Sequence, residues 1–80
     1  MKETTFEQAW SRRAAKKGWL SIKNIQTNLN GWPDRMYLKQ GKVFFVEFKS
    51  KKGRLSKLQE YRINQIRKQG FHCFVIKSKN

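Results

Sequence analysis

The pattern of apolar and polar residues divides the 80-residue chain into six segments. In residues 4–17, apolar side chains recur at helical spacing until Gly18, which predicts a first helix. Either Thr4 or Thr5, followed by Glu7, resembles a helix-capping start. The apolar positions of this helix are Phe6, Ala9, Trp10 and Ala14.

Three strands are predicted next. Residues 19–25 alternate imperfectly between apolar and polar and predict a short strand, which leads into the turn-rich segment TNLNGWPD. Residues 35–39 and 43–49 then flank Gln40 and Gly41, a short connection typical of an antiparallel hairpin. The second hairpin strand is rich in β-branched and aromatic residues, so we expect it to be central in the sheet.

The last third of the chain predicts a helix and a strand. Residues 55–70 form an amphipathic helical pattern with Ser56 as a plausible N-cap and Gly70 as the stop, and residues 71–77 predict a strand. The expected apolar face of the helix consists of Leu55, Leu58, Tyr61 or Arg62, and Ile66. The order helix, strand, strand, strand, helix, strand indicates one α/β domain over residues 1–80, with a mixed sheet of about four strands.

Charge narrows the choice of partner. The formal net charge is +14, from 19 Lys and Arg against 5 Asp and Glu, which exceeds what solubility requires and indicates a polyanion such as nucleic acid. A membrane surface is disfavoured because no apolar run approaches about 18 residues. The start of the chain has no apolar signal region, so we expect an intracellular protein. Cys73, the single cysteine, is expected to be a buried small hydrophobe.

The few acids indicate where chemistry takes place. Glu47 lies inside the most hydrophobic predicted strand, and Lys49, two residues later, projects from the same face of that strand. Asp34 precedes Glu47 by thirteen residues at the head of the partner strand. With the hairpin turn at Gln40 and Gly41, Asp34 falls roughly across from the end of the strand that carries Glu47 and Lys49.

Two carboxylates in this position favour a metal site. At a separation of about 4 Å they repel each other by roughly 4 kcal/mol at an effective dielectric constant of 20, and a divalent cation would reverse that repulsion. Carboxylate oxygens suit Mg²⁺ or Mn²⁺. A metal there would activate water and neutralise a scissile phosphate, while Lys49 would position the nucleophile and stabilise developing charge.

The string Pro33-Asp34 followed by Glu47-Phe48-Lys49 resembles the signature of the PD-(D/E)XK nuclease superfamily. More narrowly, the whole chain is similar to a stand-alone virus-type replication-repair nuclease (VRR-NUC) domain of the kind carried by phages. The similarity includes a Glu in the first helix, the Gly31-Trp32-Pro33-Asp34 element, VEFK at residues 46–49, and the KKGRLSKLQ segment that follows.

This resemblance implies a restriction-endonuclease-like core and assigns roles to single residues. Asp34 and Glu47 would bind the metal with the backbone carbonyl of Phe48, Lys49 would be the catalytic lysine, and Gln59 would support the site from the second helix. Glu7 would be the helix-borne acid at the metal, a place that Glu3 fits less well. The family also implies a structure-directed DNA endonuclease, possible activity as a Holliday-junction-type resolvase, a homodimer, and host cytoplasm as the location if a phage encodes it.

Plainer interpretations remain open. Glu47 and Lys49 would also make an ordinary surface ion pair, Asp34 an ordinary turn residue, Glu7 a helix-terminal acid, and Gln59 an exposed helical residue. The rival function is a non-enzymatic basic protein that binds nucleic acid. An enzyme that cuts RNA with the same site is a third possibility.

Basic and aromatic residues complete the hypothesis. We expect phosphate contacts from two sets of basic residues, which fix position without reading bases. These are Arg12, Arg13, Lys16 and Lys17 in the first helix, and Lys51, Lys52, Arg54 and Lys57 after the hairpin. Trp10 and Trp19 follow the apolar periodicity and are expected in the core rather than as base-stacking platforms. Trp32, beside Asp34, is expected to contact DNA or a second subunit.

Overall fold

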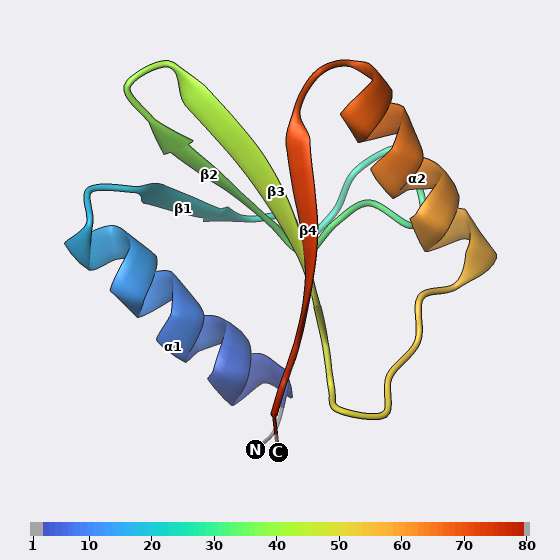
Figure 1. Ribbon diagram of the computed structural model, residues 1–80, viewed down its shortest axis with the longest axis horizontal. Helices are drawn as coiled ribbons and strands as arrows, with labels where there is room; N and C mark the ends of the chain where they lie inside the picture. The colour runs from blue at the N-terminus through green and yellow to red at the C-terminus, as the bar shows by residue number, and fades with distance from the viewer. Residues whose placement is uncertain (1–2, 80) are drawn as a thin grey trace.

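A computed structural model describes the backbone of residues 3–79 and the side chains of residues 5–79. It contains two helices and four strands in the predicted order (Figure 1). The elements are α1 (Glu3–Lys16), β1 (Leu20–Lys23), β2 (Arg35–Lys39), β3 (Lys42–Lys49), α2 (Lys57–Lys68) and β4 (His72–Lys77). The α/β fold predicted from the periodicity is therefore confirmed.

The four strands form one mixed sheet in the order β1-β2-β3-β4. The β1–β2 and β2–β3 pairs are antiparallel, and β4 runs parallel to β3 after the crossover through α2. The β2–β3 hairpin is central, as predicted. Its two connecting residues, Gln40 and Gly41, both have positive φ, at 49° and 79°, which is the backbone of the turn type that joins twisted hairpin strands most tightly.

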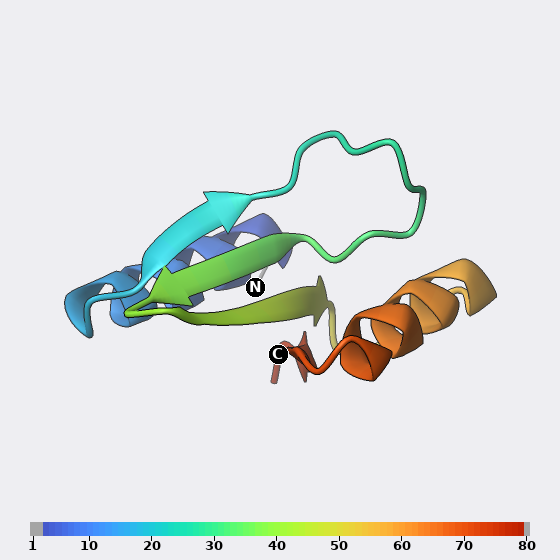
Figure 2. The same ribbon diagram turned by 90° about the horizontal axis from the view of Figure 1, so that it is seen from above.

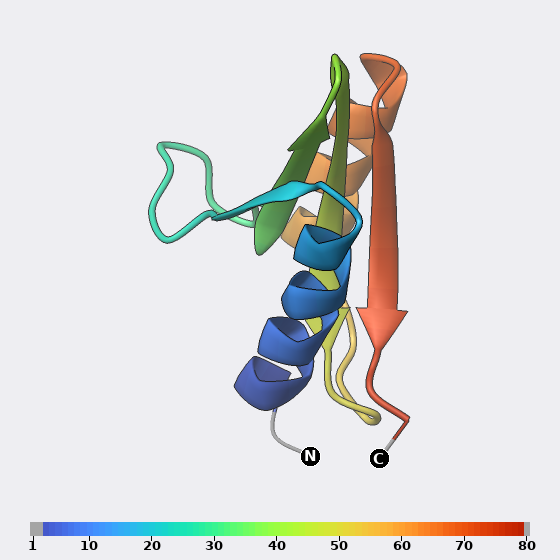
Figure 3. The same cartoon turned by 90° about the vertical axis from the view of Figure 1, so that its left-hand side faces the viewer.

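The two helices cover opposite faces of the sheet (Figures 1 and 3). The α1-side cluster is built on Ala14, Tyr37, Val46 and Phe48, and the α2-side cluster on Phe45, Ile63, Ile66 and Cys73. Side chains alternate between the faces along β3, so both faces of this strand are buried. Because Val46 and Phe48 belong to the α1-side cluster, Glu47 between them points toward α2.

Two details of the helices differ from the prediction. Helix α1 begins at Glu3, so the capping role expected of Thr4 or Thr5 is wrong, since both residues lie within the first turn. In α2 the expected apolar face is right only in part: Ile66 is buried and Leu55 packs against the α2-side cluster, whereas Leu58 and Tyr61 are 41% and 55% exposed. Ile63, which was not expected there, is buried beside Ile66 against the sheet.

Ser56 is confirmed as the N-cap of α2. Its hydroxyl oxygen accepts a hydrogen bond from the Gln59 backbone N–H at 3.1 Å, and the Gln59 side-chain oxygen accepts one from the Ser56 N–H at 2.9 Å. This reciprocal pair is a capping box, which fixes the start of the helix and the orientation of the Gln59 side chain together.

Cys73 is buried, as predicted, with 3% of its surface exposed. Burial raises the pKa of its thiol to about 11, so the group stays protonated at neutral pH and behaves as a small apolar side chain. Within residues 3–79, neither helix has the length and apolar character required to cross a bilayer.

Candidate active site

The loop between β1 and β2 delivers Asp34 to the sheet. Figure 2 shows this loop arching beyond the ends of its strands toward α2. Asn24 holds its two ends together: the side-chain amide donates to the Pro33 carbonyl at 3.0 Å, and the backbone N–H donates to the Asp34 carbonyl at 2.7 Å. Pro33 is fully buried, so the residue before Asp34 is fixed by packing as well.

The same loop rests on α2 through a close backbone approach. Gly31 has φ +81°, and a Cβ at this position would lie 2.9 Å from Leu58 Cγ and 3.1 Å from the Leu58 carbonyl. The Arg62 guanidinium donates to the Asn30 carbonyl at 2.8 Å beside it. Only glycine fits here without displacing the loop, because both its φ and its surroundings exclude a side chain.

Asp34 is joined directly to the strand that carries the other acid. Its Oδ2 atom accepts a hydrogen bond from the Phe48 backbone N–H at 2.8 Å. The β2–β3 register pairs Arg35 with Val46, and continuing it by one residue places Asp34 across from Glu47. Opposite residues of an antiparallel pair project from the same face, so both acids face α2.

Glu47 is 2% exposed and is surrounded by polar partners. Its Oε2 atom lies 3.4 Å from Lys49 Nζ and accepts a hydrogen bond from the Gln59 side-chain amide at 3.2 Å. The capping box explains the second contact, because the Gln59 oxygen is committed to the Ser56 N–H and its NH₂ group is left to point at Glu47. A carboxylate is costly to bury without such partners.

The structure therefore brings together Asp34, Glu47, Lys49 and Gln59, which we call the acidic cluster. The carbonyl of Phe48 points to the same side as its N–H, toward Asp34, because both groups of one strand residue face the same neighbouring strand. Two carboxylates and a carbonyl form an oxygen-only donor set. This set fits a hard divalent cation that keeps part of its water and uses one or two carboxylates.

Glu7 lies elsewhere. It is 5% exposed and projects from α1 onto the other face of the sheet, where its Oε2 atom accepts a hydrogen bond from Arg35 Nε at 2.5 Å. Lys23 Nζ lies 3.9 Å from the same oxygen. Among the side chains of residues 5–79, no three acids, histidines or cysteines gather closely enough to hold a metal. The structure thus does not bring Glu7 to the acidic cluster.

The predicted DNA-binding residues divide between the two sides of the sheet. Lys51, Lys52, Arg54 and Lys57 are exposed in the loop and first helical residue that follow Lys49, on the chain segment that joins β3 to α2. Arg12, Arg13 and Lys16 are exposed on α1 and Lys17 in the turn that follows it, in the layer opposite the acidic cluster. Phosphate contacts by either set stay a prediction.

The fold and the acidic cluster agree with the class that the sequence predicted, a small α/β nuclease. A family model for the VRR-NUC domain matches residues 2–80. This match covers nearly the whole chain, which therefore belongs to the VRR-NUC family. Membership makes the chain a nuclease, with DNA as the implied substrate, in a family that typically uses divalent metal ions. A search of curated proteins finds no match.

The sequence pattern did not predict the residue that closes the β1–β2 loop. Asn24 carries no motif, although its side chain and backbone both hold the Pro33-Asp34 segment. Asparagine often binds nearby backbone groups in this way, but the pattern does not reveal which turn it closes. Gly31 entered only through the resemblance. The contact with Leu58, twenty-seven residues later, supplies its physical reason.

Replacing Gly31 tests how strongly this loop determines the site. Gly31→Ala should lower the free energy of unfolding and reduce DNA cleavage, because the added Cβ pushes the Asp34 loop away from Leu58. Gly41→Ala is the matched control: its φ is +79° but nothing lies within 4 Å of the added atom, so it should cost only about 1–2 kcal/mol of backbone strain and leave cleavage intact. Equal stability and activity in the two variants would refute this role of Gly31.

Proposed function

We propose that this chain is an Mg²⁺- or Mn²⁺-dependent DNA endonuclease of the PD-(D/E)XK type, with Asp34 and Glu47 as metal ligands. One observation carries the proposal: the Phe48 N–H anchors Asp34 beside Glu47 on the face where Lys49 and Gln59 gather. Neither acid has the place of an ordinary surface residue. Glu47 is almost fully buried in a chain that has only 5 acids, and its partners are drawn from two elements.

Each member of the acidic cluster has its own role in the proposed reaction. Asp34, Glu47 and the Phe48 carbonyl would hold the cation, which supplies charge neutralisation at the phosphate and a lowered pKa for water. Lys49 is 16% exposed at the rim of the cluster, so its ammonium can reach a phosphate and stabilise negative charge that develops there. Gln59 orients Glu47 from α2. A role for Glu7 at the metal stays a prediction, and its ion pair with Arg35 does not support it.

Charge and size support the finer parts of the proposal. The basic segment that contains Lys51, Lys52 and Arg54 follows Lys49 directly, so a duplex at the acidic cluster would meet it through its phosphates. We propose a homodimer that acts on branched DNA as a resolvase, because symmetric cuts need two active sites and a domain of this size has a thin core that pairing supplements. The alternative is a basic protein that binds nucleic acid without cutting it.

Cleavage by matched carboxylate variants separates these functions. Labelled linear, nicked and four-way-junction DNA would be incubated with wild type, Glu47→Gln and Glu60→Gln, in Mg²⁺, Mn²⁺ or chelator. Glu60 is an exposed acid on α2, so its variant makes the same charge change outside the acidic cluster. We expect Glu47→Gln to lose at least about 100-fold in rate with affinity retained, since an ionic contact to the cation is removed.

The same assay can contradict the proposal. If wild type binds every DNA and cuts none with either metal, the chain is a basic binding protein and the nuclease proposal fails. If Glu47→Gln and Glu60→Gln cut at equal rates, the acidic cluster is not the site. If the assay is repeated with a labelled RNA strand and only that strand is cut, the substrate changes to RNA and the site stays the same.

Sedimentation tests the resolvase proposal by itself. At micromolar concentration, the protein should sediment as a dimer with a four-way junction bound, because both cuts belong to one complex. A monomer with and without junction DNA would exclude paired cutting and leave the endonuclease proposal standing.

A further inference from the structure

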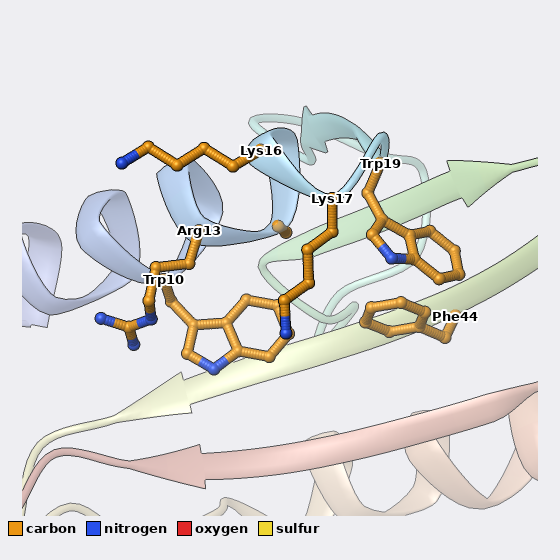
Figure 4. Close-up of a pocket in the computed structure, with 7 residues that line it drawn as sticks. Trp10, Arg13, Lys16, Lys17, Trp19 and Phe44 are labelled. Atoms are coloured by element: carbon orange, nitrogen blue, oxygen red, sulfur yellow. The ribbon is translucent and has the colours of Figure 1, made fainter.

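An aromatic pocket lies on the α1 side of the sheet, opposite the acidic cluster (Figure 4). Its volume is about 440 Å³, within the roughly 300–1,000 Å³ that is usual for small-ligand pockets. Trp10 and Trp19 stand on either side of Phe44, with ring centroids 6.2 and 4.8 Å from that ring. All three rings pack against the α1-side cluster, as expected of Trp10 and Trp19, but they are only partly buried, so aromatic surface also faces solvent here.

Cations rim this pocket. In Figure 4 the Lys17 side chain descends between the two indoles and the Arg13 guanidinium lies beside Trp10, while Lys16 extends away from the rings. Lys39 Nζ adds a cation 5.7 Å from the Trp19 ring centroid. No acid lines the pocket in the described part of the chain. Aromatic faces with basic side chains beside them suit a ligand that joins a flat ring to a phosphate.

We propose that this aromatic pocket binds an unpaired nucleotide of a DNA single strand, with the base against Trp19 or Trp10 and a neighbouring phosphate at Lys17 and Arg13. Stacking of bases on aromatic side chains beside a basic track is how proteins bind single strands without reading sequence. The site goes beyond the proposed nuclease function, because it lies on the other face of the sheet and involves no bond cleavage.

A second copy of this chain is the less suitable occupant. The chain has only 5 acids, and of these Glu7 and Glu47 are buried in ion pairs on their own faces. A second copy would therefore bring mostly positive charge to Arg13 and Lys17, and like charges across an interface are unfavourable. A DNA strand brings one negative charge per nucleotide and meets the same surface favourably.

Binding of oligonucleotides to the whole protein in chelator tests the proposal without cleavage. The probes are a dT oligomer and an abasic oligomer of equal length, which has the same phosphates and no bases. The dT oligomer should bind at least about tenfold more tightly and quench tryptophan fluorescence, because only it can stack. The quenching should persist in Trp32→Phe, which removes the indole on the α2 side.

Two variants localise the effect. Trp19→Leu should weaken dT binding by about 5- to 100-fold and leave the abasic probe unaffected. Lys17→Glu should weaken both probes at least about fivefold more than Lys68→Glu, the same change at an exposed position on α2, on the other side of the sheet. Thermal unfolding checks that each variant is folded. If Trp19→Leu does not fold, the comparison of Lys17→Glu with Lys68→Glu still tests the proposal.

Three results would overturn the proposal. Equal affinity for the dT and abasic probes would show attraction to phosphates alone. Equal losses of affinity in Lys17→Glu and Lys68→Glu would show that the DNA strand binds outside this pocket. A protein that sediments as a dimer and becomes monomeric in Trp19→Leu, with unchanged dT affinity, would assign the pocket to an interface between copies. None of these results depends on whether the protein cuts DNA.

Discussion

The hydrogen bond from the Phe48 backbone N–H to Asp34 is the constraint on which the rest of the site depends. It fixes the end of β2 against β3 at the point where the ladder stops, and thereby holds one carboxylate beside another in spite of their repulsion. The loop contacts of Asn24 and Gly31 also position Asp34, because they hold the loop that carries it. Glu47 needs no such loop, since its position follows from the alternation along β3.

The sheet separates two kinds of surface, one on each of its faces. Toward α2 lies the acidic cluster, completed by a glutamine whose cap contact aims its amide at Glu47. Toward α1 lie the aromatic pocket and the Glu7–Arg35 ion pair, which joins α1 to β2. One strand serves both sides, because neighbouring residues of β3 alternate between them. Because of this alternation, a small basic domain can carry an acidic site on one face and keep the positive charge that attracts DNA.

Much of this was predictable from the sequence, and the failures have physical causes. Glu47 and Lys49 share a face because strand residues repeat with period two, and Ser56 was predicted as the N-cap of α2, whereas the reciprocal contact of Gln59 in the capping box was not. Glu7 lies on the other face of the sheet from the acidic cluster because α1 packs on that face, and the sequence did not reveal Arg35 as its partner. The apolar face of α2 was predicted correctly at Ile66 and wrongly at Leu58, because Leu58 and Ile63 compete as apolar positions and only tertiary contact with the sheet decides between them.

Paramagnetic broadening of backbone amide signals by Mn²⁺ would show whether Asp34 and Glu47 hold the metal, because it locates a cation without requiring turnover. We expect substoichiometric Mn²⁺ to broaden the amides of Asp34 and of Glu47, Phe48 and Lys49 first, and Asp34→Asn to abolish this selectivity. Broadening centred on Glu7, or spread evenly over the chain, would contradict the assignment of the metal site to the acidic cluster.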